Sequence, residues 1–187
     1  MILGRVGVIL TDREILAAIN GKQIEIDPVP SPERLSSTSV DFRLSDNFST
    51  WKSGAGFALQ PGDPSYSYGA IAHLQEKIKQ EEYKLKPKCL VLAWTMERIS
   101  IPIHSKLAAR VEGKSSMARI GIGVHITAPT IHCGFNAPIQ LEMYNFGPFE
   151  VILKSGMPIC QVIFEQTFGT PDKGYAGMFA NQKPSGP

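Results

Sequence analysis

The chain lacks features that mark several large classes of protein. Its 187 residues carry a formal net charge of only +2, whereas a protein that binds along a nucleic-acid backbone needs a basic stripe. No apolar run approaches the ~20 residues of a membrane span. We therefore expect no nucleic acid and no membrane among its partners, and any recognition of phosphate should be local.

Cysteine is also scarce. The three cysteines, Cys89, Cys133 and Cys160, form an odd and widely spaced set, which does not suggest a disulfide framework. The N-terminal stretch MILGRVGVILTDRE has no long apolar segment followed by a small-residue cleavage site. Both observations predict a reduced, cytoplasmic compartment.

Two chemical motifs are incomplete. A P-loop requires G-x-x-x-x-G-K-[ST] before a sustained helix, but Ala108 occupies the first glycine position ahead of the Gly-Lys-Ser at 113–115. His132 and the cysteines supply zinc-ligand types without the spacing of a zinc site, and the signature H-x-E…P-C-x-x-C of zinc deaminases is absent. We therefore expect neither a P-loop nor a zinc ion.

A short polar segment still suggests phosphate binding. Lys114, Ser115, Ser116 and Arg119 place two cations and two hydroxyl groups within six residues. Such groups suit a phosphate, but an exposed turn with an ion pair to Glu112 explains them equally well. The residues alone leave both interpretations open.

The composition and hydrophobic pattern predict a single domain over residues 1–187. A chain of this length with 43% hydrophobic residues can bury a full core. Near the N-terminus, Thr11 and Glu14 form a capping box, the apolar stripe comprises Ile15, Leu16 and Ile19, and Asn20-Gly21 ends the short helix. A second short helix is expected within residues 70–82.

The remaining apolar segments read as strands. Alternation at Ile24/Ile26 and at Val40/Phe42/Leu44 predicts two of them, and short apolar runs punctuated by Pro or Gly follow. These runs span residues 89–101, 106–113, 121–128, 137–146, 149–156 and 158–166. Their spacing predicts a mainly antiparallel sandwich or barrel. Residues 170–187 have no core pattern and would be disordered unless a partner or ligand orders them.

One strand carries a candidate acid–base group. In PIQLEMYNF, alternation places Ile139, Leu141 and Met143 on one face, with Gln140 and Glu142 on the other. A solvated strand glutamate is one interpretation of Glu142. In a dry pocket, however, burial would raise the pKa of this carboxyl group and let it move protons near neutral pH.

Several motifs in order resemble one known family. The stretches VLAWTMERISIP, LAARVEGKSSMARIGIGVHITAPTIHCGFNAPIQLEMYN and GMPICQVIFE are similar to the dCTP deaminases of the trimeric dUTPase superfamily. The N-terminal ILTDREILAAINGKQIEIDP and STSVDFRLSDNF extend the resemblance over nearly the whole chain.

The resemblance implies a fold and an activity. It implies a distorted β-barrel or jelly roll that forms a homotrimer with active sites shared between subunits. The implied reaction is the deamination of dCTP to dUTP and ammonia, in pyrimidine deoxynucleotide biosynthesis. No zinc takes part, Mg²⁺ comes with the triphosphate, and dTTP is a candidate inhibitor.

The resemblance also assigns roles to residues. It makes Glu142 the catalytic proton carrier, Arg119 its supporting arginine, and Ser115 with the carbonyl group of Ala128 the holders of the attacking water. The implied substrate-binding residues are Lys114, Ser115, Ser116, Arg119, His132, Gln140, Gln161, Tyr175 and Gln182. Residues 170–187 would form a C-terminal lid or flexible tail.

Two positions depart from the family pattern. His132 replaces an aspartate that contacts the sugar 3′-hydroxyl, and Met178-Phe179 replace a common Lys-Tyr pair of the tail. The alternatives are therefore a dUTP pyrophosphatase, a bifunctional deaminase and pyrophosphatase, or a non-catalytic nucleotide-binding regulator. The sequence also leaves open whether the substrate is dCTP, a lower phosphate or a modified cytosine nucleotide.

Overall fold

Antiparallel strands make up most of the fold in the computed structural model, which describes residues 8–52, 54, 56, 58–127 and 129–184. The strands are β1 (Glu25–Asp27), β2 (Leu35–Ser36), β3 (Ser39–Trp51), β4 (Gln75–Lys79), β5 (Glu82–Leu85), β6 (Leu90–Ser100), β7 (Leu107–Gly113), β8 (Ile122–Gly123), β9 (Asn136–Asn145), β10 (Val151–Lys154) and β11 (Pro158–Gln166). The helices are α1 (Asp12–Asn20), α2 (Tyr68–Ile71) and α3 (Ser115–Ala118), and single 3₁₀ turns occupy Pro32–Arg34, Ala72–Leu74 and Ile103–Ser105.

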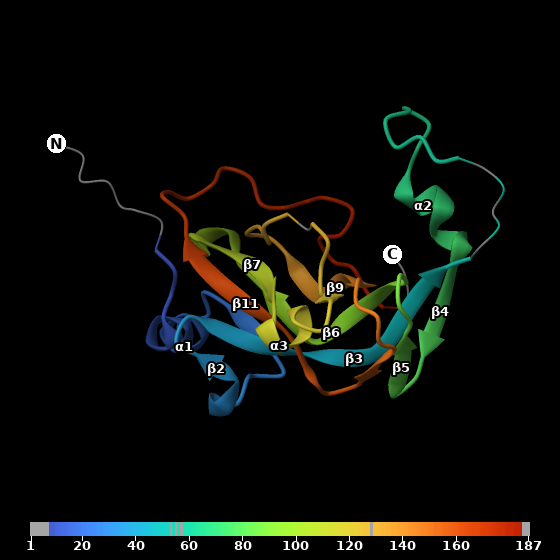
Figure 1. The fold of residues 1–187 in the computed structure, drawn as a ribbon. Coiled ribbons are helices and arrows are strands. Elements are labelled where there is room, and N and C mark those ends of the chain that lie inside the picture. The colour runs from blue at the N-terminus through green and yellow to red at the C-terminus, as the bar shows by residue number, and fades with distance from the viewer. Residues whose placement is uncertain (1–7, 53, 55, 57, 128, 185–187) are drawn as a thin grey trace.

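The main sheet curves back on itself. Its central path runs β7-β11-β3-β6-β9-β8, β1 adds to β6, and β2 and β4 add to β3, while β10 and β5 form a separate two-stranded sheet. Ala109 of β7 bridges to Ile131, just before β9, so the two ends of the path approach each other. Figure 1 shows the result, with α1 and α2 at opposite ends of the molecule. The predicted barrel-like, mainly β fold is confirmed.

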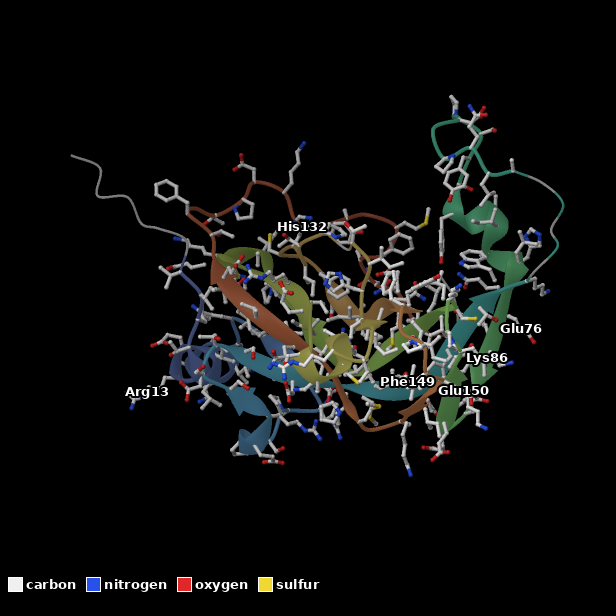
Figure 2. All side chains as sticks on the ribbon, in the orientation of Figure 1. Arg13, Glu76, Lys86, His132, Phe149 and Glu150 are labelled. Carbon is white, nitrogen blue, oxygen red and sulfur yellow. The ribbon has the colours of Figure 1, made fainter. Side chains whose placement is uncertain are left out.

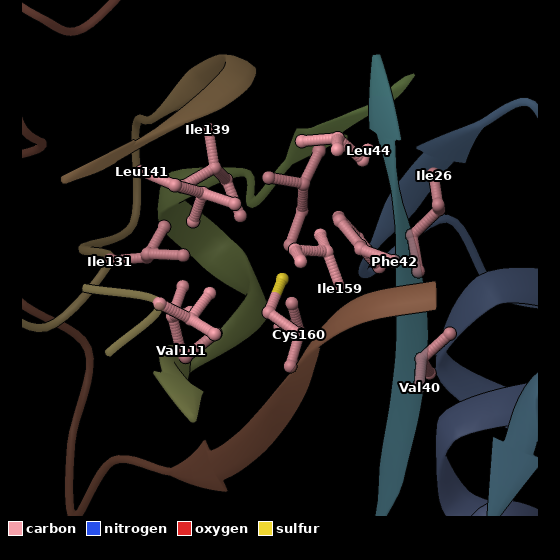
Figure 3. Packing of buried hydrophobic residues seen from close by; sticks show 14 of the residues in the cluster. Ile26, Val40, Phe42, Leu44, Val111, Ile131, Ile139, Leu141, Ile159 and Cys160 are labelled. Carbon is pink, nitrogen blue, oxygen red and sulfur yellow. The ribbon is translucent and has the colours of Figure 1, made fainter. Parts of the chain in front are cut away.

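The core lies inside this curved sheet. Strand residues of alternating burial point inward, and they include Phe42, Leu44, Leu141 and Ile159, which are completely buried. Figure 3 shows side chains from β3, β9 and β11 meeting in this core. Burying one such side chain contributes ~1.5–3 kcal/mol, so the inward pattern fixes which face of each strand remains available for a site.

The N-terminal helix follows the prediction with one exception. Helix α1 ends at Asn20, and the N–H of Thr11 donates to the Glu14 carboxylate at 3.2 Å. Ile15 is completely buried, but Leu16 is 45% exposed. Assigning Leu16 to the buried stripe was therefore wrong, because only one edge of this helix faces the sheet.

The predicted second helix is mostly strand. Helix α2 ends at Ile71, and β4 begins at Gln75 after one 3₁₀ turn. Ile71 and Ile78 have a helix-like spacing, but Ile78 pairs with Phe48 of β3 and packs against the core. Pairing with a long neighbouring strand overrides the local helical preference of this segment.

Two predicted strands are shorter than their apolar runs. The run at 121–128 contributes only β8, and the run at 149–156 only β10. Beside β8 the backbone of Gly121, at φ +88°, packs on Gly147. A Cβ added at Gly121 would lie 2.6 Å from the Gly147 Cα. The N–H of Phe146 donates to the Gly121 carbonyl at 2.7 Å, which connects the turn after α3 to the residue that follows β9.

The tail packs against the barrel. The N–H of Tyr175 donates to the Cys133 carbonyl at 2.7 Å, the Ala180 carbonyl accepts from Asn136, and Ala180 is buried. In the described part of this segment, backbone hydrogen bonds to the start of β9 take the place of a core pattern, and the expected lid or flexible tail stays a prediction. Over the described ranges, no helix is long and apolar enough to cross a membrane.

Candidate active site

The outer face of β9 carries a cavity, which we call the Glu142 cavity. Intermediate burial of Gln140 and Glu142 alternates with full burial of their neighbours, as predicted. The cavity has a volume of about 450 Å³, within the usual range for small-molecule sites. Five predicted site residues line it: His132, Gln140, Glu142, Tyr175 and Gln182.

Glu142 is the carboxyl group of this cavity. Its Oε2 atom is buried and has no hydrogen-bond partner within the described residues. Burial raises the pKa of Glu142, and a backbone hydrogen bond and the nearby His125 act against this rise. The group can therefore hold a proton at a higher pH than an exposed glutamate, which is the property that a general acid–base residue needs.

The rim of the cavity is formed by the turn before β9 and by the tail. The His132 and Tyr175 rings lie 5.7 Å apart between centroids, and Tyr175 also contacts Phe135. Figure 2 shows His132 at this edge of the barrel. The Gln182 side chain donates to the Pro138 carbonyl at 3.0 Å. The structure thus brings these residues together around Glu142.

A second group of predicted residues lies around the turn after β7. Lys114 precedes the one-turn helix α3 and pairs with Asp41 of β3, with 2.6 Å between Nζ and Oδ2. Gln161 of β11 donates to the other carboxylate oxygen of Asp41 at 3.3 Å. Asp41 therefore holds Lys114 and Gln161 on one surface.

The remaining members of this group point outward. Ser115, Ser116 and Arg119 are exposed. Within the described ranges the Arg119 guanidinium has no ion-pair partner. The lining of the Glu142 cavity includes none of residues 114–119 and not Gln161. The predicted site is therefore divided in a single chain between the Glu142 cavity and the 114–119 segment.

The structure tests the suggested ion pair of Glu112, but it does not describe Ala128. Glu112 pairs with Arg110 at 3.2 Å, and Lys114 pairs with Asp41 instead, so the suggested ion pair between the 114–119 segment and Glu112 is wrong. Ala128 lies outside the described residues, and its predicted contact with water stays a prediction.

Sequence reasoning missed several residues of the site. Asp41 was missed because its role depends on pairing between strands, although the alternation at Val40/Phe42/Leu44 indicated a strand at this point. Trp51, Tyr68 and Phe179 line the cavity from three distant segments. Their aromatic character was the only available signal, and it does not reveal which rings meet.

Potential metal ligands are dispersed in the described structure. Over the described ranges, no three or more His, Cys, Asp and Glu side chains gather in a geometry that could hold a metal ion. The expected absence of zinc stays a prediction.

Comparison with known proteins identifies the family. The profile of the dCTP deaminase-like family matches residues 9–167. A dCTP deaminase, dUMP-forming, from Methanosphaera stadtmanae is 34% identical over 170 residues, which cover 89% of this chain and 83% of the relative. The dCTP deaminase of Rhodospirillum rubrum is 33% identical over 171 residues, covering 89% and 87%.

The fold agrees with a solved structure. The crystal structure of 2′-deoxycytidine 5′-triphosphate deaminase from Agrobacterium tumefaciens superposes with a TM-score of 0.65 at 20% identity. The match covers 87% of this chain and 49% of that chain, so this protein spans about half the length of that neighbour. The curved antiparallel sheet, the sequence profile and the two relatives together show that the chain belongs to the dCTP deaminase-like family.

Proposed function

We propose that this protein hydrolytically deaminates dCTP, releasing ammonia and dUTP. The observation that carries the proposal is the half-buried Glu142, which lines the cavity and whose buried Oε2 atom has no hydrogen-bond partner in the described structure. A carboxyl group in this state can both accept and return a proton. The names of the relatives support a cytosine nucleotide as the substrate.

The proposed mechanism assigns the proton transfers to Glu142. Ionised Glu142 takes a proton from water as the water oxygen bonds to C4, and passes this proton to N3. The tetrahedral intermediate then collapses: the new hydroxyl loses its proton through Glu142 to the amino group, the C4–N bond breaks, and ammonia leaves. General acid–base help of this kind accelerates a reaction about 10²–10⁴-fold.

The 114–119 segment would complete the site from another subunit. Its separation from the Glu142 cavity within one chain supports a homotrimer in which the two meet across an interface. Ser115 and the Ala128 carbonyl would hold the water, Arg119 would balance charge at the reacting centre, and Lys114, Ser116 and Gln161 would contact phosphates. Tyr175 and Gln182 would cover the nucleotide, while His132 and Gln140 would contact its sugar and base.

Mg²⁺ would accompany the triphosphate. The nearest carboxylate to Lys114 is Asp41, which already pairs with Lys114 and accepts from Gln161. Phosphate oxygens, which are hard ligands, would therefore hold the ion. The ion's contribution would be to neutralise part of the phosphate charge.

The product distinguishes this proposal from its main alternative. The Methanosphaera relative is named dUMP-forming, which favours a bifunctional enzyme as a second candidate. Hydrolysis at the phosphate would require a second base, and Glu142 is the only acidic side chain among the described residues that line the cavity. His132 occupies the position where the resemblance expects an aspartate.

The decisive experiment measures ammonia and pyrophosphate separately. The protein is incubated with dCTP, dCDP, dCMP and dUTP, and products are separated chromatographically. We expect ammonia and dUTP from dCTP without matching pyrophosphate. Equal amounts of ammonia, dUMP and pyrophosphate would establish the bifunctional enzyme instead. Binding of nucleotides without either product would identify a regulator, and inclusion of dTTP tests inhibition.

A pair of variants tests the role of residue 132. His132→Asp restores a carboxylate, and we expect slow pyrophosphate release from dUTP. His132→Asn supplies an amide of the same size without the charge and serves as the matched control. If both variants or neither released pyrophosphate, a carboxylate at residue 132 would not determine which product forms.

A further inference from the structure

Tyr68 lies in the wall of the Glu142 cavity. It begins α2, which lies in the chain between the paired strands β3 and β4 (Figure 1). We call these paired strand ends, with the segment that joins them, the β3–β4 extension. Its ring makes edge contacts with Trp51, 6.0 Å between centroids, and with Phe179 of the tail, 5.3 Å. All three rings line the cavity beside Glu142, so the extension and the tail together supply one aromatic wall.

The phenol group of Tyr68 has a defined hydrogen-bonding state. The Gln75 amide donates to the phenolic oxygen at 2.6 Å, so the oxygen accepts from the protein while its own hydrogen remains for donation. Burial raises the pKa of Tyr68, and although the hydrogen bond from Gln75 opposes this rise, the negative charge of Glu142 adds to it. The phenol therefore remains protonated and can donate at neutral pH.

A planar ring and one donor suit a heteroaromatic base. Aromatic rings pack against one another with centroids about 4.5–7 Å apart, and cytosine carries ring and carbonyl acceptors. We propose that Tyr68 is a specificity-determining residue that contacts the pyrimidine, with its ring packed on the base and its hydroxyl group donating to a base acceptor. This inference rests on the proposed function, because it assumes that the base enters the Glu142 cavity.

Binding can be measured without turnover. Both tryptophans of the chain, Trp51 and Trp94, line this cavity or the smaller hollow that adjoins it across Tyr68. Their emission therefore reports nucleotide binding directly. Titrations would use Tyr68→Phe, which keeps the ring, and Tyr68→Ala, which removes it. Tyr66→Phe and Tyr66→Ala are matched controls, since Tyr66 lies two residues away and does not line either hollow.

We expect a graded loss of affinity. Tyr68→Phe should raise the Kd for dCTP about threefold to tenfold, which is the usual effect of losing one hydrogen bond. Tyr68→Ala should raise it more than about tenfold because ring packing is lost as well. Both Tyr66 variants should stay within about twofold of the parent. In turnover assays Tyr68→Phe should raise KM with kcat nearly unchanged.

The nucleoside separates base contacts from phosphate contacts. If Tyr68 touches the base, its variants should weaken the binding of deoxycytidine by the same factor as that of dCTP, whereas Lys114→Ala should weaken only dCTP. Circular dichroism checks folding, and Tyr68→Leu replaces the alanine variant if that one unfolds.

Two results would overturn the inference. One is a Kd for Tyr68→Ala within about twofold of the parent, and the other is a loss seen with dCTP but not with deoxycytidine. A parent that binds deoxycytidine but releases no ammonia would contradict the proposed reaction while leaving the base contact standing. A parent that binds no pyrimidine nucleotide would contradict both.

Discussion

The Glu142 cavity and the 114–119 segment differ in depth, charge and bonding. The cavity is concave, lined by aromatic rings, and holds a carboxyl group with a buried, unpartnered oxygen. The 114–119 segment is a convex turn with exposed hydroxyl groups and two cations, of which Lys114 is already paired with Asp41. One region is suited to exclude water from a base, and the other to meet phosphate in water.

Under the proposed function, this difference makes the two regions complementary parts of one site. A hollow without cations binds a triphosphate poorly, and a turn without walls cannot orient a base. In the proposed homotrimer, the cavity of one copy would meet the 114–119 segment of the next, and a symmetric ring would repeat this contact. The experiments below test whether the cavity handles the base while the 114–119 segment contacts the phosphates.

The largest effect is expected from Glu142→Gln. The amide keeps the shape of the carboxyl group but cannot carry the proton, so ammonia release should fall by about 10²–10⁴-fold. Nucleotide binding should change little. Glu150→Gln is the control because Glu150 (Figure 2) is exposed just before β10 and does not line the Glu142 cavity. Turnover within about tenfold of the parent would remove Glu142 from the mechanism.

Mixing two inactive variants tests whether the halves meet between copies. Glu142→Gln and Arg119→Ala should each be inactive alone. If each site takes one residue from each of two neighbours, every trimer that contains both variants should have one of its three sites intact. Co-expression with two different affinity tags and assay of the doubly purified protein measures this recovery. No recovery in a protein that sediments as a mixed trimer would place both residues in one chain's site.

Replacing Lys114 and replacing Arg119 should change different kinetic constants. Lys114→Ala should raise the KM for dCTP about tenfold while kcat changes little, since a phosphate contact made before reaction sets binding. Arg119→Ala should mainly lower kcat if Arg119 organises the reacting centre as we propose. Steady-state kinetics on both variants checks this split, with Lys154→Ala on an exposed strand as the control. An effect of both variants on KM alone would assign Arg119 to the phosphates.

The smallest effect concerns stability and pH. Burial raises the folded-state pKa of Glu142 above its ordinary value of 4.5, so ionising this group costs more in the folded chain than in the unfolded one. This loss of folding stability is fully present above the raised pKa of folded Glu142 and disappears below the pKa of the unfolded chain. At pH 8, Glu142→Gln should therefore have a Tm a few degrees above that of the parent, since ~2–4 °C corresponds to 1 kcal/mol for a chain of this size. Near pH 4 the two proteins should have the same Tm.

Thermal denaturation from pH 4 to 8 measures this difference. Glu150→Gln should show no such trend because its carboxylate is exposed. A Tm difference between Glu142→Gln and the parent that stays constant with pH would mean that the amide acts through packing rather than charge.

Strands with a clear alternating pattern were predictable from the sequence. Ile139, Leu141 and Met143 face the core as expected, because a period of two leaves one face for burial. The segment after Ile71 was not predictable, since its apolar spacing fits a helix and only its pairing with β3 makes it a strand. Leu16 was misassigned for a similar reason: the width of the face that α1 buries depends on its neighbour.

Five of the predicted site residues line one cavity, but the contacts around them were not predictable. The resemblance pointed to Glu142 and Lys114 individually, yet it could not indicate that Asp41 pairs with Lys114. Nor could it indicate that Tyr68 and Phe179 meet in one wall. Such contacts join segments distant in the sequence, and the chain's local pattern carries no information about them. The tail shows the same limit, because backbone hydrogen bonds replace a hydrophobic signal.

The packing of Gly121 on Gly147 has a consequence for protein engineering. A Cβ at either position would meet the backbone of the other segment, so no change at one position makes room for a side chain at the other. A mutant library that aims to reshape the surface beside the 114–119 segment should leave both glycines fixed and diversify Ile120 or Phe146, whose side chains are exposed. Variation would then alter the surface of the turn while its anchor to β9 stays intact.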